Sequence, residues 1–147
     1  MMTVKDLLKS GLGSVVQITP TDTVHRALQL MVDNKAGLVA VTDGDRLAGI
    51  FTEGDFFQNT VLMGRSSLNT PISEIMTKNM ITARPEQTLD ECLELMTQNH
   101  ISHLLVKEGD RLVGNVSKHD IMERIISANQ DLIGRLENYI LGADYGR

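Results

Sequence analysis

Two short motifs in this chain each place a hydroxyl side chain three residues before a carboxylate. The first, TEGD, runs from Thr52 to Asp55, and the second, SKHD, runs from Ser117 to Asp120. Where such a motif starts a helix, the unpaired backbone N–H groups and the partial positive charge of the helix end attract phosphate. A carboxylate can also accept hydrogen bonds from both hydroxyls of a ribose. The two motifs are therefore candidate sites for a phosphorylated sugar such as a nucleotide.

The same motifs are also good helix caps, and that role needs no ligand. The hydroxyl of Thr52 or Ser117 can accept a hydrogen bond from a free backbone N–H group, and the acid then lies in the first helical turn. Such a cap stabilises a helix by about 1 kcal/mol. The short pattern is frequent in proteins, so these residues alone leave capping, ligand binding or both open.

Both motifs end a longer repeated segment. A displacement of 65 positions places Pro20 on Pro85 and the segment GDRLAG, residues 44–49, on GDRLVG, residues 109–114. Identities continue in this register up to the terminal aspartate of each motif. The chain therefore contains a duplicated folding unit.

Each unit shows the same succession of predicted elements. In the first unit an extended segment, residues 15–19, is followed by apolar residues from Val24 to Met31 at the i, i+3, i+4, i+7 spacing of one helix face. Two short apolar runs, residues 38–41 and 47–51, flank a TDGD turn and predict paired strands. A second helix begins at TEGD, so the predicted order is strand, helix, strand, strand, helix.

The ends of the helices can also be predicted. Thr88 and Glu91 form a capping box in the second unit, whereas Thr23 in the first unit has only its own hydroxyl to offer. Gly37 is the expected stop of the first helix. Gly49 and Gly114 precede the two motifs, and we expect them to let the backbone approach a ligand closely.

A polar linker, GRSSLNTPISEIMT, separates the two units. In it, Thr70 is the expected N-cap of a short helix and Pro71 its first residue. A similar segment, VKDLL, precedes the first unit. We expect the first unit with its N-terminal helix at residues 1–66, the second unit at 67–130, and a C-terminal helix and tail at 131–147.

Apolar residues recur beyond the second unit, from Met122 to Ile140. Their spacing predicts a long amphipathic helix, which we expect to be interrupted at Gly134. Such a helix needs a surface to pack against.

Composition restricts the possible partners. The 147-residue chain is 41% hydrophobic and carries a formal net charge of −5 without a block of Lys and Arg, which argues against nucleic-acid binding. No apolar stretch is long enough for a signal peptide or a membrane helix. The single cysteine, Cys92, excludes an internal disulfide. We therefore expect a cytoplasmic globular protein that binds small molecules or proteins.

Catalytic and metal sites find little support. Cys92, His100 and His103 could be imagined as a metal site, but Cys92 falls on the apolar face of a helix and structural zinc normally takes four ligands. No two carboxylates stand out as an acid and base pair, and no glycine-rich phosphate loop is present. We expect no catalytic residue, no metal and no catalytic cofactor.

The two units resemble a tandem pair of cystathionine-β-synthase (CBS) domains. The resemblance extends from about residue 15 to residue 126 and rests on ITPTDTVHRALQLM and GDRLAGIFTEGDF in one unit, and on ITARPEQTLDECLELM and GDRLVGNVSKHDI in the other. It implies an α/β (α+β) fold in which two βαββα units pack pseudo-symmetrically through their sheets. It also implies a homodimer that senses an adenine nucleotide (AMP, ADP or ATP) or NAD or S-adenosylmethionine, and that regulates an unknown protein target in trans.

The resemblance also implies which residues bind the nucleotide. The motif hydroxyls and carboxylates take the phosphate and ribose roles, Thr82, Ala83 and more loosely Thr19 match positions that line the adenine, and His103 and His119 lie beside the sugar or phosphate. The expected nucleotide-binding residues are Thr19, Thr52, Asp55, Thr82, Ala83, His103, Ser117, His119 and Asp120.

Some residues depart from the family pattern. Gly54 and Ser102 stand where related modules often carry a basic residue, so we expect the second motif, with His119, to bind anions better than the first. Asn115 interrupts an apolar strand and is expected to face the pocket, because a buried amide without partners costs about 1–3 kcal/mol. The low cation content also supports an alternative, a dimeric scaffold whose clefts bind nothing.

Overall fold

A computed structural model describes residues 2–9 and 14–144. Residue 1 and residues 10–13 of the expected first unit, and residues 145–147 of the expected C-terminal tail, lie outside the described residues. The helices are α1 (Val4–Lys9), α2 (Val24–Asn34), α3 (Glu53–Phe56), α4 (Leu89–Asn99) and α5 (Lys118–Asp144), with a π-helical turn at Phe57–Val61 and a 3-10 turn at Ile72–Glu74. The strands are β1 (Gln17–Ile18), β2 (Leu38–Asp43), β3 (Arg46–Thr52), β4 (Thr82–Ala83), β5 (His103–Glu108) and β6 (Arg111–Ser117).

The strands form one sheet in the order β1-β2-β3-β6-β5-β4. Its two halves join at β3 and β6, where the Leu47 N–H donates to the Asp110 carbonyl and the Leu112 N–H donates to the Asp45 carbonyl, both at 3.0 Å. These two hydrogen bonds are related by the same displacement of 65 residues that relates the repeats. The structure therefore confirms two βαββα units that pack pseudo-symmetrically through their sheets.

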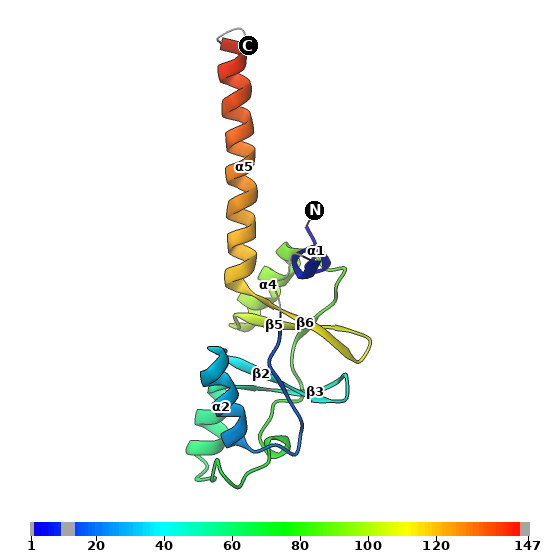
Figure 1. The fold of residues 1–147 in the computed structure, drawn as a ribbon, viewed down its shortest axis with the longest axis vertical. Coiled ribbons are helices and arrows are strands. Elements are labelled where there is room, and N and C mark those ends of the chain that lie inside the picture. The colour runs from blue at the N-terminus through cyan, green and yellow to red at the C-terminus, as the bar shows by residue number, and fades with distance from the viewer. Residues whose placement is uncertain (1, 10–13, 145–147) are drawn as a thin grey trace.

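The apolar runs of β2 and β5 are continuous because both of their faces are buried. In β2, Val39 and Val41 pack in the core of the first unit, while Leu38 and Ala40 point the other way. The second pair meets Leu105 of β5 between the two halves of the sheet, which face each other in Figure 1. Successive strand residues point to opposite faces, so a strand covered on both sides shows no polar alternation.

The two small helical segments are exchanged between the units. The Val4 N–H of α1 donates to the Gln87 carbonyl of the second unit at 2.9 Å, and the Ile72 N–H donates to the Asp22 carbonyl of the first unit at 2.7 Å. Val4 is buried in the core of the second unit and Ile72 in that of the first. Each segment therefore precedes one unit in sequence and packs on the other.

The helix starts agree with the sequence, but some ends differ. Thr88 forms the predicted capping box, and Thr23 caps α2 by its hydroxyl alone. The expected stop of α2 at Gly37 is wrong. The helix ends at Asn34 because the next residue, Lys35, takes a left-handed conformation (φ 51°) and donates its N–H to carbonyls of the last turn.

The short helix of the linker also begins later than expected. Thr70 does not cap it; Pro71 occupies the cap position, without a side-chain hydrogen bond. The Thr70 carbonyl instead accepts from the Val24 N–H at 2.9 Å, which ties the linker to the start of α2.

The long C-terminal helix is present, but its expected interruption at Gly134 is wrong. The 27 residues of α5 are continuous, and it projects away from the two units in Figure 1. One glycine in a helix interior costs only about 1 kcal/mol relative to alanine, which is too little to break a helix of this length. No helix in residues 2–9 and 14–144 is long and apolar enough to cross a membrane.

Candidate functional site

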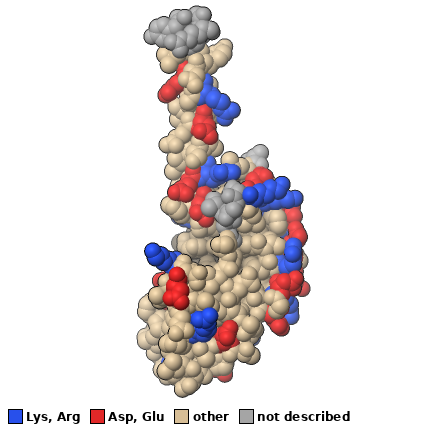
Figure 2. Space-filling view, viewed as in Figure 1, with Lys and Arg blue, Asp and Glu red and all other residues tan. Residues whose placement is uncertain are grey.

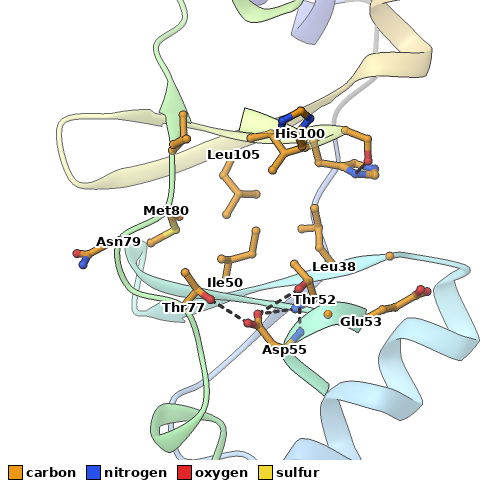
Figure 3. A pocket seen from close by; sticks show the side chains of 16 residues that line it. Leu38, Ile50, Thr52, Glu53, Asp55, Thr77, Asn79, Met80, His100 and Leu105 are labelled. Carbon is orange, nitrogen blue, oxygen red and sulfur yellow. Dashed lines mark hydrogen bonds between the residues drawn. The ribbon is translucent and has the colours of Figure 1, made fainter. Parts of the chain in front are cut away.

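Two clefts lie between the units, and both units contribute to each of them. The first cleft has a volume of about 540 Å³ and lies beside the first motif. The end of β3 and the start of α3 form one side, and residues 79–81 and the loop before β5 come from the second unit. Figure 3 shows Leu38, Ile50, Met80 and Leu105 around this space, so its walls are mostly apolar.

The second cleft is the pseudo-symmetric counterpart, at about 290 Å³. The end of β6 and the start of α5 form one side, and Val15, Val16 and the loop at residues 34–38 come from the first unit. Val15 and Val16 occupy the positions equivalent to Met80 and Ile81 of the first cleft. Each motif therefore faces residues of the opposite unit.

The first motif is fully engaged in capping. Asp55 is 9% exposed, and its Oδ2 accepts from the Thr52 N–H at 3.0 Å and from the Thr52 hydroxyl at 3.2 Å. Its Oδ1 accepts from the Thr77 hydroxyl at 2.9 Å and from the Asn59 amide at 3.4 Å. The Thr52 hydroxyl in turn accepts from the Asp55 N–H at 3.2 Å. Figure 3 shows the hydrogen bonds among Thr52, Asp55 and Thr77 at the floor of the first cleft, and the capping prediction is confirmed here.

The second motif makes only part of this network. The Ser117 hydroxyl accepts from the Asp120 N–H at 3.0 Å. In contrast to Asp55, the Asp120 carboxylate accepts no hydrogen bond from any residue that the structure describes. Among the described residues, the carboxylate and the hydroxyl proton of Ser117 both lack a partner, and both can bind a ligand in the second cleft.

Asn115 adds an unpartnered polar atom to the second cleft. Its side-chain oxygen is buried and has no hydrogen-bond partner among the described residues. The residue lines the cleft, as the sequence predicted. A buried acceptor without a partner is unfavourable, and a hydrogen-bond donor on a ligand would satisfy it.

His103 lies in the wall that the two clefts share. The Ser102 hydroxyl lies 3.1 Å from its Nδ1. Burial lowers the pKa of His103 below its ordinary value, and the nearby negative charge of Asp120 partly opposes this effect. The imidazole is therefore held in its neutral form at pH 7, and it can offer either a donor or an acceptor to a ligand.

The two clefts differ in charge. Among the described residues that line the first cleft there is no Lys or Arg, and Glu53 and Asp55 contribute carboxylates. The second cleft includes Lys35. Lys35 was not among the predicted site residues; its equivalent position in the second unit, His100, lines the first cleft.

Lys35 and His100 share an unusual backbone conformation. They are the non-glycine residues with positive φ in the described part of the chain, at 51° and 54°. Both are left-handed helix ends, where glycine is favoured because a Cβ atom costs about 1–2 kcal/mol. Lys35 and His100 thus line the clefts in a backbone conformation that is unfavourable for a residue with a side chain.

Three of the predicted adenine-lining residues lie outside both clefts. Ala83 is fully buried in the core of the second unit, and Thr82 pairs with Leu105 in the sheet. Thr19 is exposed, and its hydroxyl donates to the Asp22 carboxylate at 3.2 Å. The residues that do line the clefts come one to five positions earlier in the chain: 79–81 in the first cleft and 14–16 in the second.

The sequence predicts that His119 lies beside the ligand and that Gly49 lets the backbone approach it, but the structure surrounds both residues differently. His119 is 78% exposed and lies outside both clefts, with its Nε2 at 3.2 Å from the Glu123 carboxylate. A Cβ at Gly49 would lie 2.6 Å from the Met76 sulfur and 3.0 Å from the Thr77 carbonyl. The close approach at Gly49 is therefore to the linker and not to a ligand.

The cysteine belongs to the core. Cys92 is fully buried in the second unit, and burial, with a smaller effect of Glu91, raises its pKa to about 11. The thiol is therefore protonated at pH 7. Among the described residues, no group of three or more His, Cys, Asp or Glu side chains could hold a metal ion.

Comparison with known proteins identifies the family. The family model for the CBS domain matches residues 4–60 and again residues 72–127. The chain belongs to the CBS-domain family.

Several relatives share this pair of CBS domains. The chain is 35% identical over 149 residues to the CBS domain-containing protein CBSX3, mitochondrial, of Arabidopsis thaliana, with 95% of this chain and 72% of the relative covered. It is 30% identical to YhcV of Bacillus subtilis, with 82% and 84% covered. The solved structure of a CBS-domain protein from Burkholderia ambifaria has a TM-score of 0.78 and 37% identity, and covers 86% of this chain and 95% of that one.

Proposed function

We propose that this CBS-domain pair is a regulatory module that binds an adenine nucleotide of the AMP, ADP or ATP class, or NAD or S-adenosylmethionine, between its two units. The observation that carries the proposal is the contrast between the two motifs. Asp55 accepts four hydrogen bonds within the protein, whereas the carboxylate of Asp120 has no described partner. A carboxylate left free beside Ser117 and Asn115 suits the two hydroxyls of a ribose.

Lys35 supplies the charge that a phosphate needs in the second cleft. At the start of α5 the Lys118 N–H donates to the Ser102 carbonyl at 2.8 Å and the Asp120 N–H donates to the Ser117 hydroxyl, so the helix end contributes mainly its partial positive charge. His103 and Leu38 then line the part of the cleft next to the first unit. The expected binding residues Ser117, Asp120 and His103 thus lie in one cleft, and Lys35 and Asn115 join them. We assign no ligand contact to Thr19, Thr82, Ala83 or His119.

The first cleft is larger and more apolar. Thr52 and Asp55 lie on its floor but are committed to each other and to Thr77. Its carboxylates and its lack of a described Lys or Arg disfavour a polyphosphate. We propose that nucleotide binds first in the second cleft.

A signal can arise because residues of both units line each cleft. A ligand that contacts both Lys35 of the first unit and Asp120 of the second favours one spacing of the units over others, and it shifts the population toward that spacing. We propose that this change, in a homodimer, is transmitted to an unidentified protein target in trans.

Binding without catalysis is part of the proposal. CBSX3 and YhcV are named only as CBS domain-containing proteins. The chain also matches arabinose 5-phosphate isomerase KdsD of Escherichia coli at 28% identity, but over only 37% of that enzyme, so the isomerase activity is not carried over. The structure of CBSX2 in complex with AMP shares 17% identity and a TM-score of 0.73. That likeness concerns the fold, and the ligand class rests on the residues of the cleft.

A cytoplasmic location stays a prediction from the sequence. The name of the Arabidopsis relative places it in mitochondria, so the compartment needs its own test. Microscopy of the tagged chain in its own cell would decide between the cytoplasm and mitochondria.

A thermal-shift panel of AMP, ADP, ATP, NAD and S-adenosylmethionine tests the proposal. A ligand at 100 times its dissociation constant stabilises the folded state by about 2.7 kcal/mol, which corresponds to several degrees. We expect such a shift for at least one adenine compound. No shift for any of them would overturn the sensor function.

Two variants locate the binding site. Lys35→Gly relieves the left-handed backbone, so we expect the free protein to be at least as stable as wild type while the ligand-induced shift falls. The matched control is His100→Gly, which makes the same backbone change in the other cleft and is expected to keep the shift. Equal ligand-induced shifts of the melting temperature in the two variants would show that Lys35 does not contact the ligand.

The alternative function, a dimeric scaffold with clefts that bind nothing, is favoured by one observation. The helical turn after α3 exposes large apolar side chains, including Phe57, Leu62 and Met63. Apolar surface of this kind is typical of protein contacts. The scaffold would be preferred if the ligand panel failed and substitution of these residues abolished self-association.

A further inference from the structure

The second half of α5 has an apolar face with no partner among the residues that the structure describes. The helix runs to Asp144, whereas the family match ends at residue 127 and the packing of α5 on the second unit is at Ile121 and Ile125. Beyond these residues the helix projects from the module in Figure 1. Its large apolar side chains are each about half exposed or more: Ile126, Leu132, Ile133, Leu136, Tyr139, Ile140 and Leu141. A helix on its own gains little stability in water, so this face requires a partner.

The spacing of the apolar residues identifies the kind of partner. Steps of three, four, three and four residues lead from Ile126 through Asn129, Ile133 and Leu136 to Ile140. This 3.5-residue period is the repeat of a left-handed coiled coil, in which the isoleucines occupy the a positions and Leu136 a d position. β-branched residues at a with leucine at d favour two parallel strands.

We propose that α5 pairs in parallel with α5 of a second copy of this chain, as a two-stranded coiled coil over residues 126–141. In this arrangement each seam residue meets its own counterpart. The two Asn129 side chains then face each other and can form a hydrogen bond within the seam. A shift of one helix along the other would place Asn129 against an apolar residue and leave its amide without a partner, which is unfavourable.

The charges of the helix agree with a second copy as the occupant. The positions flanking the seam hold Leu132 and Tyr139 on one side and Gln130 and Glu137 on the other, so a parallel pair brings no like charges together. Figure 2 shows charges of both signs on the projecting part of the helix. Between residues 126 and 141 the one basic residue is Arg135, which does not match the cationic face of a helix that binds a membrane surface.

The seam and its flanking positions present a continuous apolar surface. Six large apolar side chains, each about half exposed or more, lie there on each helix: Ile126, Leu132, Ile133, Leu136, Tyr139 and Ile140. Pairing of two helices removes this surface from water on both of them. Parallel pairing also places the second units of the two copies next to each other.

Association can be measured by sedimentation equilibrium on the full chain. We expect wild type to dimerise, and the double variant Ile133→Glu/Ile140→Glu to raise the dimer dissociation constant at least tenfold. Asn138→Glu adds the same charge to the opposite side of the helix and is the matched control, expected to dimerise like wild type. A monomeric wild type, or a double variant that associates like the control, would overturn the proposal.

Cysteine cross-linking tests the parallel orientation. In a Cys92→Ala background, chains carrying Leu136→Cys should form an interchain disulfide on mild oxidation, because equivalent d positions meet in a parallel pair. Chains carrying Asn138→Cys should not. A disulfide formed instead between Ile126→Cys and Ile140→Cys chains, without one at Leu136→Cys, would show an antiparallel pair and refute the parallel seam. No disulfide in any combination would refute pairing through this face.

Discussion

The paired carboxylates Asp55 and Asp120 provide a direct test of which motif serves stability and which is free for a ligand. They occupy equivalent positions of the repeat, so the same substitution can be compared at both. Asp55→Ala removes a capping box and four accepted hydrogen bonds. Asp120→Ala removes a first-turn charge but no described side-chain hydrogen bond.

The expected losses of stability follow from these contacts. The first-turn charge of Asp55 contributes about 0.3–1 kcal/mol, and the half-buried N–H of Thr52, left without the acceptor of its capping box, adds about 1–3 kcal/mol. The other three donors are the half-buried Thr52 hydroxyl and the exposed side chains of Thr77 and Asn59, which can bind water. We therefore expect Asp55→Ala to lower the free energy of unfolding by about 2–4 kcal/mol. For Asp120→Ala the expected loss is no more than about 1 kcal/mol.

The assay is urea unfolding followed by far-UV circular dichroism, together with thermal melts without ligand. In a chain of this size about 1 kcal/mol corresponds to roughly 2–4 °C, so Asp55→Ala should melt roughly 5–10 °C below wild type. Asp120→Ala should stay within roughly 4 °C of wild type while it loses stabilisation by the adenine compound that binds. Asp55→Ala is expected to lose mainly folding stability, and Asp120→Ala is expected to lose mainly stabilisation by the ligand. Each variant is therefore a control for the other.

Two results would refute the reasoning. Equal losses of stability in the two variants would mean that the hydrogen bonds of Asp55 do not stabilise the fold. A large loss in Asp120→Ala, with ligand stabilisation unchanged, would mean that Asp120 is a structural cap and not a ligand contact.

Three other predictions follow from single side chains. Gly49→Ala should lower the free energy of unfolding by about 1–3 kcal/mol in urea, because its Cβ would meet the linker, whereas Gly134→Ala, in open space, should raise it by up to about 1 kcal/mol. Because the pKa of His103 is lower in the folded chain than in the unfolded one, its contribution to stability is present above pH 6.5 and should decline as the pH falls below that value. Comparison of wild type with His103→Gln in urea at pH 5 to 8 checks this, and parallel curves would contradict it. Cys92 should not react with a thiol reagent at pH 8 until the protein is unfolded, because burial raises its pKa to about 11.

Most of the fold could be predicted because it is encoded locally and twice. The displacement of 65 residues, the helix-face spacing in α2 and α4 and the turns of the GDRL segments each depend on neighbouring residues. Helix starts were also predictable, since the cap of Thr88 needs only Glu91. Helix ends were less so. Lys35 ends α2 in the left-handed conformation, for which a sequence pattern predicts glycine. The hydrogen bonds from its N–H to carbonyls of the last turn hold it there.

The clefts could be predicted only in part. The two motifs led to Thr52, Asp55, Ser117 and Asp120, but the opposite wall of each cleft comes from the other unit, which is distant along the chain. The proposed roles of Thr19, Thr82 and Ala83 relied on family positions without that geometry. Lys35 was overlooked because its role depends on which loop faces which motif, and this is a property of the packing of the two units.

The sequence by itself determined the duplicated unit, the order of its elements and the capping chemistry at both TEGD and SKHD. These features depend on contacts within a few residues, which a linear pattern can show. Only the tertiary structure decided that the carboxylate of Asp55 is saturated while that of Asp120 has no described partner. The donors to the Oδ1 of Asp55 include Thr77, 22 residues away along the chain, and no residue that the structure describes makes such a contact at Asp120. Two motifs of the same residue types thus acquire different chemistry from what the fold places beside them.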